Sequence, residues 1–341
     1  MKKFLSLALA LITALSLTAC GDNPSDNTPT DDEAVQTVTL KMGHKMSEDS
    51  LDGKAFQKFA DLVYEKSDGS VKIDLYPSSQ LGDGSAQVNN VLLGSQDIYA
   101  ESYSEWVGVT PLADVGGSVP FLFTSEEDYF NLVRGDFGKE QLAALEAGGV
   151  VELNTARNWM RPYRVLCTTN KKIESLDDLN GLRLRTWENA SYMTCWDNLG
   201  TKPIVIGWTD TYLALSQGTA DAVTSPASSV EQMGFYEVAP YVGKFNEFPQ
   251  EIAISMNKAK FDSLSESQQQ ALIDAANEAG KYAVSILSDE LDASFERMAA
   301  AGATVYDIDT TTWREALADI YKQIEASGGL PTGLCESLGI K

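Results

Sequence analysis

Apolar positions along the first hundred residues alternate between a spacing of two and a spacing of three to four. Residues 38–44 (VTLKMGH) and 71–77 (VKIDLYP) alternate apolar and polar side chains, which predicts strands. Residues 52–67 space their apolar side chains three or four apart, which predicts a helix. Residues 85–94 predict a second helix and residues 96–102 a third strand. Strand, helix, strand, helix, strand in this order favours right-handed crossovers and a largely parallel sheet.

The chain between Arg164 and Thr224 repeats this order of strands and helices. Strands are expected over 164–170, 182–186, 201–207 and 220–224, a short helix or turn over 175–181, and helices over 191–200 and from about 210 to 218. Thr209 is the expected N-cap of the last of these helices, and Gly218 its C′ residue. A second α/β region therefore follows the first.

Two later helices have the sequence form of a capping box, Ser265-x-x-Gln268 and Thr312-x-x-Glu315. The first opens a helical stretch that is closed by Gly302. This stretch of roughly 35 residues would be about 50 Å long if straight, at 1.5 Å per residue. A helix of that length exceeds one small domain, so we expect it to reach across two. The chain, with 43% hydrophobic residues, suffices for two domains of ordinary size.

The N-terminus has the layout of a secretory signal. Lys2 and Lys3 precede an apolar stretch over 4–17 that is too short for a membrane span. The following Leu-Thr-Ala-Cys sequence resembles a bacterial lipobox, which implies cleavage before Cys20 and lipid on that residue. The alternative is an ordinary signal peptide with an incidental cysteine. Residues 1–19 are therefore predicted to be a lipoprotein signal peptide.

Residues 20–36 are polar, rich in Pro, Asp and Asn, and short of apolar side chains, so they predict a disordered tether. The expected location is outside the cytoplasm, with lipid anchoring at a bacterial membrane, in the periplasm or on the outer face of the cell membrane. Contact with the membrane is expected through the lipid anchor only. No cofactor is expected.

The acidic balance of the chain, 49 Asp and Glu against 26 Lys and Arg, excludes broad classes of partner. A formal net charge of −23 argues against binding nucleic acid or anionic headgroups through the protein surface. The single histidine, His44, and the absence of closely spaced cysteines argue against a multi-histidine metal site, so no metal is expected. Export makes one disulfide feasible, and Cys167–Cys195 is the more natural pair, although sequence alone does not determine the pairing.

Arg183 and Arg185 alternate with leucines, so they are expected on one face of a short strand. Ligands of parallel α/β sheets sit outside the carboxyl ends of the strands. Arg185, the more C-terminal of the two, is therefore expected nearer that crevice, and Arg183 is expected to be solvated. Polar side chains at or just past other strand ends are further candidates: His44, Glu101 and Tyr103.

Five motifs in order resemble those of the DctP-type substrate-binding proteins of tripartite ATP-independent periplasmic (TRAP) transporters. They are YPSSQLGD (76–83), VPFLF (119–123), IESLDDLNGLRLRT (173–186), DTYLALSQGTADAV (210–223) and FDSLSESQQQAL (261–272). The resemblance runs from about Val38 to Leu330. It implies an α/β, two-domain, periplasmic-binding-protein-like clamshell with a long inter-domain helix. The implied division is discontinuous: 37–161 plus 250–289 form domain I, and 162–249 plus 290–330 form domain II.

The resemblance also implies ligand-binding residues. The arginine that ends the family's Gly-Leu-Lys-Ile-Arg strand pairs with a substrate carboxylate, and here it is Arg185. A second basic contact falls at Arg164, although Arg157 and Arg161 are alternatives. The asparagine that often touches the ligand is replaced by Ser225. The remaining candidates are Tyr212, Trp208, Trp187, Gln80, His44, Glu101 and Tyr103.

These features predict a non-enzymatic receptor that binds a small organic carboxylate and delivers it to TRAP membrane permease subunits. The segment MGHKMSED (42–49) resembles family members that bind uronates, which favours a sugar acid. Receptors for a C4-dicarboxylate, keto acid or aromatic acid, serving a TRAP or ABC importer or a sensor, are the alternatives. A lipid-anchored hydrolase is a remote alternative. It is considered because paired carboxylates such as Glu101 and Glu105 can serve glycoside cleavage.

Overall fold

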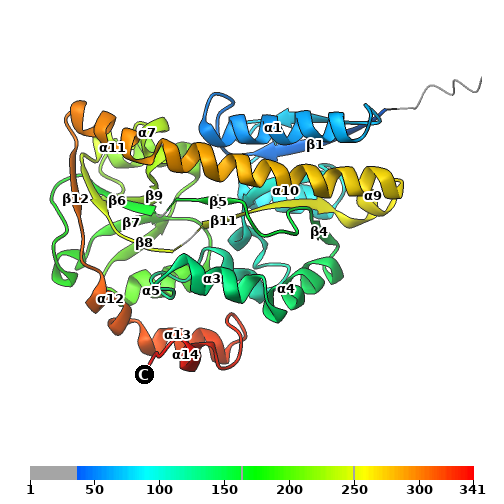
Figure 1. Cartoon of the computed structure of the whole chain (residues 1–341). Helices are drawn as coiled ribbons and strands as arrows, with labels where there is room; N and C mark the ends of the chain where they lie inside the picture. Colours follow the sequence, from blue (N-terminus) through cyan, green and yellow to red (C-terminus); the bar gives the residue numbers. More distant parts are fainter. Residues whose placement is uncertain (1–36, 163, 249) are drawn as a thin grey trace, which may run out of the picture. The chain divides into compact units, whose positions relative to one another are not determined.

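The computed structural model describes residues 37–162, 164–248 and 250–341 (Figure 1). The predicted signal peptide (1–19), the predicted tether (20–36) with Cys20, and the crossover residue Pro249 lie outside the described residues. No helix within the described ranges is both long and apolar enough to cross a membrane.

The first sheet has the strand order β2-β1-β3-β11-β4, and β5 pairs with β11. Its strands are β1 (Val38–His44), β2 (Val71–Tyr76), β3 (Ile98–Ser102), β4 (Val150–Glu152), β5 (Met160–Arg161) and β11 (Gln250–Asn257). The strands β1, β2 and β3 are mutually parallel, as expected, with Leu40 opposite Ile73. The later strand β11 is antiparallel to β3 and makes the sheet mixed.

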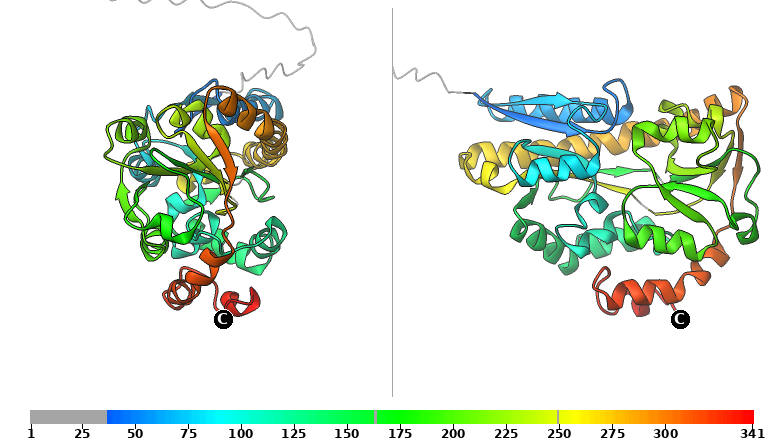
Figure 2. Two further views of the ribbon diagram at one scale, coloured as in Figure 1. Left: turned by 90° about the vertical axis from the view of Figure 1, so that its left-hand side faces the viewer. Right: turned by 180° about the vertical axis from the view of Figure 1, so that it is seen from behind.

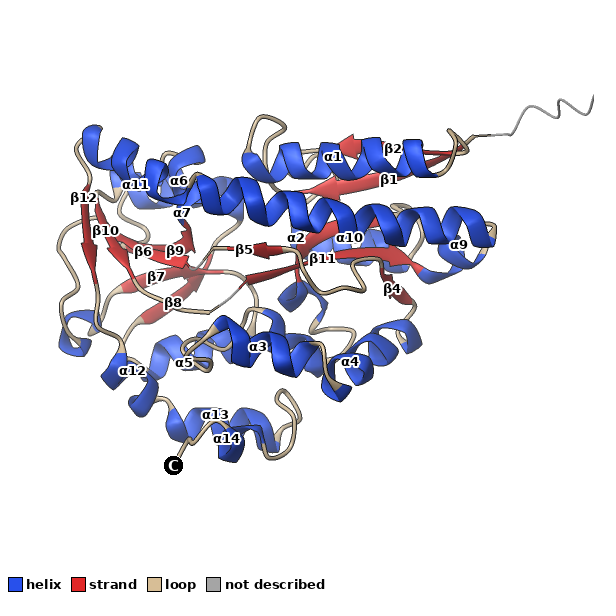
Figure 3. Cartoon of the chain, in the orientation of Figure 1, coloured by secondary structure: helices blue, strands red, loops and turns tan. Residues whose placement is uncertain are grey.

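The second sheet has the order β12-β10-β6-β9-β7-β8. Its strands are β6 (Arg164–Thr168), β7 (Arg183–Thr186), β8 (Lys202–Val205), β9 (Ala222–Pro226), β10 (Tyr241–Lys244) and β12 (Thr304–Asp307). The strands β7, β8 and β9 are parallel, whereas β6 is antiparallel to both β9 and β10. Figure 3 shows the strands of the two sheets side by side, in red.

Helices cover the faces of both sheets. Before β6 they are α1 (Leu51–Lys66), α2 (Gly84–Leu92), α3 (Glu126–Val133) and α4 (Asp136–Ala147), with the 3-10 turns η1 (Tyr103–Trp106) and η2 (Pro111–Gly116). Within the second sheet's connections they are α5 (Ala190–Asn198), α6 (Thr211–Ser216), α7 (Ala227–Gln232) and α8 (Phe235–Val238), with η3 (Leu176–Leu179) and η4 (Trp208–Asp210). The last are α9 (Lys258–Asp262), α10 (Glu266–Asp289), α11 (Leu291–Ala300), α12 (Thr311–Ala316), α13 (Ala318–Ala326) and α14 (Leu334–Ser337).

The expected long helix is present as α10 and α11, which meet at Glu290. The Ser265 capping box at its start is confirmed. Leu272 of α10 packs in the core cluster of the first sheet, together with α1, whereas Met298 of α11 packs in a cluster of the second sheet. The helix therefore reaches from one sheet to the other, as the right-hand view in Figure 2 also shows.

The chain passes from one sheet to the other at three places. Sheet membership changes between Arg161 and Arg164, and again between Lys244 and Gln250. The α10–α11 junction is the third connection. The exact domain boundaries remain a prediction.

Two predicted helix starts are wrong, although Gly218 does adopt the expected left-handed conformation after α6, with φ +70°. The helix α6 follows η4 directly, its N-cap position is Asp210, and no side chain accepts from its first amides, so Thr209 does not cap it. The helix α12 begins one residue before Thr312. The expected capping box does not form there. In the loop before the helix, Asp309 instead accepts from the Thr311 amide at 3.0 Å.

The suggested disulfide is absent: Cys167, Cys195 and Cys335 are all free and buried. Cys167 lies in β6 within an apolar cluster of the second sheet, and Cys195 lies in α5 within another cluster. The two thiols therefore face different cores. Burial raises the pKa of both, so they stay protonated in the folded protein.

Candidate functional site

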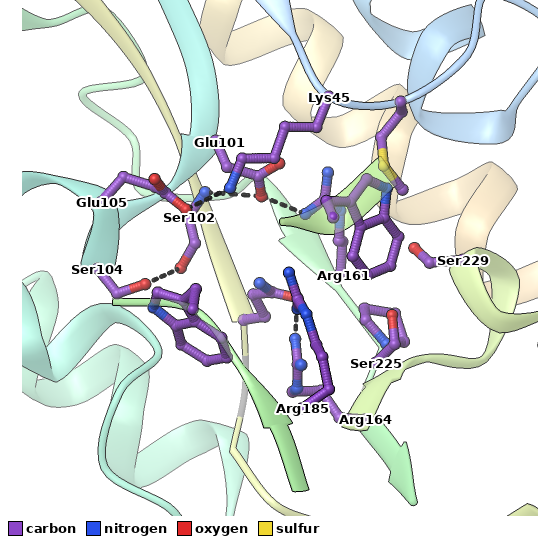
Figure 4. A pocket seen from close by; sticks show the side chains of 15 residues that line it. Lys45, Glu101, Ser102, Ser104, Glu105, Arg161, Arg164, Arg185, Ser225 and Ser229 are labelled. Atoms are coloured by element: carbon purple, nitrogen blue, oxygen red, sulfur yellow. Dashed lines mark hydrogen bonds and ion pairs between the residues drawn. The ribbon is translucent and has the colours of Figure 1, made fainter. Parts of the chain in front are cut away.

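A cavity of about 50 Å³ lies where the two sheets face each other (Figure 4). The first sheet and its loops contribute Lys45, Met46, Glu101, Ser102, Ser104, Glu105, Arg161 and Gln250, and the second contributes Arg164, Arg185, Trp187, Trp208, Ser225, Pro226 and Ser229. A wider cavity of about 360 Å³ shares Lys45, Glu105, Arg185, Trp187 and Trp208 with it. We call the first the inner cavity and the second the outer cavity.

Arg185 extends from β7 into the inner cavity with only 6% of its surface exposed. Its Nε donates to the Ile206 carbonyl at 2.9 Å, and its guanidinium carbon lies 5.4 Å from the centre of the Trp208 ring. Among the described residues no carboxylate pairs with it. Burial, and then the neighbouring positive charge of Arg164, lower the pKa of Arg185 to about 10. Arg185 is thus a buried cation without a counter-ion.

Arg183, two residues earlier on the same strand, has a counter-ion. Its Nη2 lies 2.6 Å from Asp221 Oδ1, and its Nε donates to Oδ2 of the same carboxylate at 2.8 Å. The expectation that Arg183 lies away from the crevice is confirmed, because it lines neither the inner nor the outer cavity. It is paired with Asp221 rather than simply solvated.

Arg164 lines the inner cavity, but its donors are turned toward protein acceptors. Its Nε donates to Glu247 at 2.9 Å, its Nη1 to Gln250 at 3.2 Å and its Nη2 to the Thr224 hydroxyl at 2.9 Å. Glu247 is completely buried and also accepts from Tyr192 and Trp196, at 2.9 and 2.8 Å. Arg164 therefore ties the segment before β11 to the start of β6.

Arg161 joins two carboxylates of the first sheet's side of the cavity. It donates to Asp52 at 2.7 Å and to Glu101 at 2.6 Å, with all three side chains nearly inaccessible. Burial by itself would raise the pKa of Glu101, but the charges of Arg161 and Lys45 outweigh it and lower that pKa to about 2. Glu101 is consequently an ionised acceptor at the cavity wall.

Lys45 and Glu105 form the remaining ion pair of the wall, with Nζ and Oε1 2.5 Å apart. Lys45 directly follows β1, and Glu105 lies in η1 just past the end of β3. Both line the inner and the outer cavity. Figure 4 shows this pair and the Glu101–Arg161 pair on the same side of the site, facing Arg185 and Arg164.

Several buried polar atoms around the inner cavity have no hydrogen-bond partner among the described residues. They are Nε1 of Trp187, Nε1 of Trp208, Oγ of Ser225, Oγ of Ser229 and Nη2 of Arg161. Buried donors normally make a hydrogen bond, because a buried donor without an acceptor costs about 1–3 kcal/mol. Together with Arg185 they can donate to a small molecule that is anionic and rich in oxygen atoms.

Two candidate residues lie in other parts of the core. His44 is buried, its ring centre is 4.6 Å from that of Phe56, and it lines a separate cavity with Glu48. Tyr103 is fully buried beneath Arg157, whose guanidinium carbon is 4.2 Å from the ring centre. Their positions at strand ends are as expected, but their side chains do not line the inner cavity.

Two further candidates lie near the surface. The hydroxyl of Tyr212 donates to Glu237 at 3.1 Å, and 37% of the tyrosine is exposed. Gln80 is exposed and lines neither the inner nor the outer cavity. The candidates that the structure does bring together at the inner cavity are Arg185, Arg164, Ser225, Trp208, Trp187 and Glu101.

Sequence reasoning missed several residues of the inner cavity, chiefly Lys45, Ser104, Ser229 and Gln250. Extending the strand-end rule by one residue after β1 would have included Lys45. Gln250 carried no such signal, because β11 is buried along its whole length and does not alternate.

Comparisons with known proteins agree on one family. The model of bacterial extracellular solute-binding protein family 7 (DctP) matches residues 42–327. The 2,3-diketo-L-gulonate-binding periplasmic protein YiaO of Escherichia coli is 28% identical over 287 residues, which cover 84% of this chain and 86% of that protein.

Two solved structures illustrate the fold. A TRAP periplasmic solute-binding protein from Chromohalobacter salexigens, with bound D-glucuronate, has a TM-score of 0.81 at 25% identity, covering 88% of this chain and 98% of that one. The sugar acid binding protein DctPAm from Advenella mimigardefordensis, in complex with galactonate, has a TM-score of 0.82 at 25% identity, covering 89% and 97%.

Proposed function

The chain belongs to family 7 of the bacterial extracellular solute-binding proteins, the DctP family, and from that premise we propose that it is a TRAP receptor for a sugar acid. The expected ligand is a uronate or an aldonate, bound outside the cytoplasm. The acid binds at the inner cavity and is not chemically changed there. The receptor then delivers the acid to membrane permease subunits.

The observation that carries this proposal is the unpaired guanidinium of Arg185. A buried cation without a counter-ion is unfavourable unless a ligand supplies the negative charge. A guanidinium offers two parallel N–H donors that match the two oxygens of a carboxylate. The Nη atoms of Arg185 accordingly bind the acid group, while its Nε holds the Ile206 carbonyl.

The polar wall of the cavity suits a ligand with several hydroxyls. Glu101 and Glu105 accept from hydroxyls, and the unpartnered indole and serine groups donate to oxygens. Trp187 and Trp208 add flat apolar surfaces on which a sugar ring packs. Related proteins at 25% identity hold D-glucuronate and galactonate, acids of this kind.

We propose that ligand binding closes two domains over the cavity, with the boundaries predicted above: 37–161 plus 250–289, and 162–249 plus 290–330. The cavity wall draws on both sheets, so a bound acid bridges them. Gln232 of α7 donates to Ser47, after β1, at 2.6 Å, which supplies a direct contact between the two sides. Differential affinity for the closed form would then drive closure.

Two further parts of the proposal rest on the family resemblance and the sequence. The lipid anchor at Cys20 would hold the receptor near the membrane, and the TRAP permease would take the acid from it. Mass spectrometry of the membrane-extracted protein would test the first, since a diacylglyceryl cysteine adds a defined mass. Loss of uptake in a permease deletion would test the second.

The binding test is a thermal-shift panel on residues 21–341. It compares uronates and aldonates with C4-dicarboxylates, keto acids and aromatic acids. The variant Arg185→Ala is run beside Arg183→Ala, which removes the neighbouring arginine outside the cavity. A sugar acid that stabilises the wild type and Arg183→Ala, but not Arg185→Ala, is the expected result. Stabilisation by a C4-dicarboxylate, keto acid or aromatic acid alone would overturn the sugar-acid assignment. Stabilisation that survives Arg185→Ala would overturn the role of that residue.

A further inference from the structure

Four cationic side chains line the inner cavity, and three of them already have carboxylate partners. Lys45 pairs with Glu105, Arg161 pairs with both Asp52 and Glu101, and Arg164 pairs with Glu247. Only Arg185 lacks such a partner in the part of the chain that the structure describes. The first carboxylate of a ligand would therefore take Arg185, and no cation of this lining without a carboxylate partner among the described residues would be left for a second anionic group.

The Lys45–Glu105 pair stands where the far end of a ligand would lie. Both residues line the inner and the outer cavity, as Arg185 does. A sugar acid held at Arg185 by its carboxylate therefore extends toward this pair. Lys45 and Glu105 are only 15% and 11% exposed at their side chains, so solvent screens their charges weakly.

The first residue of α2 lies directly against the Glu105 carboxylate. A Cβ atom at Gly84, the first residue of α2, would lie 2.1 Å from Glu105 Oε2 and 3.1 Å from Lys45 Nζ. Glycine at this position leaves room for the pair against the start of the helix. Glu105 is therefore enclosed between Lys45 and the start of α2, with little of its side chain exposed.

We propose that the Lys45–Glu105 pair makes this receptor selective for acids with a single negative charge and excludes diacids such as aldarates. The inference rests on the proposed function, sugar-acid binding at Arg185. A terminal hydroxyl or ring oxygen is compatible with the pair, because Glu105 accepts a hydrogen bond and Lys45 donates one. A second carboxylate meets the charge of Glu105, and the Lys45 charge that would attract it is already neutralised.

The first test compares each monoacid with the diacid that differs from it only at carbon 6. Isothermal titration of the wild-type protein is carried out with galactonate and galactarate, with gluconate and glucarate, and with galacturonate and glucuronate as ring-forming monoacids. The expected result is at least tenfold tighter binding of the monoacid in every pair that binds. A diacid that binds as tightly as its monoacid would overturn the inference and leave the proposed function standing. Failure of every sugar acid to bind would overturn the proposed function itself.

The second test changes the pair directly. Glu105→Gln keeps the shape of the side chain and frees the Lys45 charge, so the aldarate-to-aldonate affinity ratio is expected to rise at least tenfold. Glu188→Gln is the matched control, because Glu188 is an exposed acid of the outer cavity with no ion pair among the described residues. Its ratio is expected to stay within twofold of the wild type.

The double variant Lys45→Gln/Glu105→Gln separates the two charges. It also removes the charge of Lys45, so the rise in the aldarate-to-aldonate affinity ratio that is expected for Glu105→Gln should disappear. An unchanged ratio in a folded Glu105→Gln protein, with native circular dichroism, would overturn the role of the pair. The wild-type ratios decide the proposal if that variant does not fold.

Discussion

Arg183 and Arg185 extend from the same strand two residues apart, and Asp221 pairs with Arg183 but not with Arg185. Asp221 directly precedes β9, so its carboxylate reaches the beginning of β7 and not the end. The end of β7 faces the inner cavity, where Arg185 has only a carbonyl partner in the described structure. Position along one strand thus separates a structural arginine from one that is available to a ligand.

The buried pair of Arg164 and Glu247 predicts a large effect on stability. Glu247→Gln leaves the guanidinium, 5% exposed at its side chain, without its counter-ion. Breaking one partner of a buried pair costs about 3–5 kcal/mol, so the free energy of unfolding in urea is expected to fall by that amount. The control is Glu237→Gln at the exposed Tyr212 contact, with an expected change of about 0.5 kcal/mol or less. A fall below about 1 kcal/mol for Glu247→Gln would contradict the prediction.

The unpartnered indole of Trp208 predicts an effect on affinity without a matching loss of stability. Trp208→Phe removes an N–H that is unsatisfied in the cavity wall, and a lost hydrogen bond of about 0.5–1.5 kcal/mol corresponds to roughly two- to twelvefold weaker binding of the sugar acid. Trp313→Phe removes a similarly unsatisfied indole N–H from a core cluster away from the cavity. Isothermal titration should show weaker binding for the first variant only. Equal affinities in both would place the Trp208 indole outside the contact.

Glu152 predicts a loss of stability between acidic and neutral pH. This carboxyl is buried, and burial raises its pKa to about 7 despite hydrogen bonds from the Ile254 and Asn154 amides. An acid whose folded-state pKa is raised stabilises the fold fully below the unfolded value of 4.5, and that contribution is lost as the pH rises through 7. The loss amounts to about 3 kcal/mol.

The matching variant is Glu152→Gln, which cannot ionise. Urea unfolding of the two proteins at pH 4.5 and pH 8 isolates this group, because every other titrating residue is common to both. The wild type is expected to lose about 3 kcal/mol relative to the variant between these two pH values. Parallel pH dependence of the two proteins would show that Glu152 ionises normally.

His44 predicts an unusually low titration midpoint. Burial, together with the charge of Arg161, outweighs the attraction of Glu101 and lowers the pKa of the imidazole to about 4. Because His44 is the only histidine of the chain, its ring proton signals need no assignment in a one-dimensional NMR spectrum. They should not shift between pH 5.5 and 8, and a midpoint above pH 6 would refute the prediction.

The sign of this shift also predicts acid sensitivity. A base with a depressed pKa stabilises the fold above its unfolded value of 6.5, and the contribution is lost as the pH falls toward 4. Substitution His44→Phe should reduce that loss, measured as the change in unfolding free energy between pH 7 and pH 4.5. A variant with the same acid sensitivity as the wild type would show that His44 does not cause it.

Sequence patterns predicted most of the elements that form the cavity wall. Alternation predicted β1, β2 and β7, the residues of β3 and β6 were also predicted as strands, and the Ser265 capping box predicted the start of α10. The strand β11 was not predicted: all eight of its residues are buried, and it lies outside the two strand-and-helix repeats in which the equally buried β3 and β6 were found. The N-cap predictions at Thr209 and Thr312 failed because the helices begin elsewhere, after Asp210 and Thr310.

The sequence by itself determined the order of strands and helices, the family, and the arginine at the end of β7. Those features depend on residues within a few positions of one another, or on motifs that a relative shares. Only the tertiary structure decided which charges are neutralised, because Arg164 and Glu247 lie 83 residues apart in the chain and Lys45 and Glu105 lie 60 apart. Folding brings these pairs within hydrogen-bond distance and leaves Arg185 at the inner cavity without a carboxylate partner among the described residues.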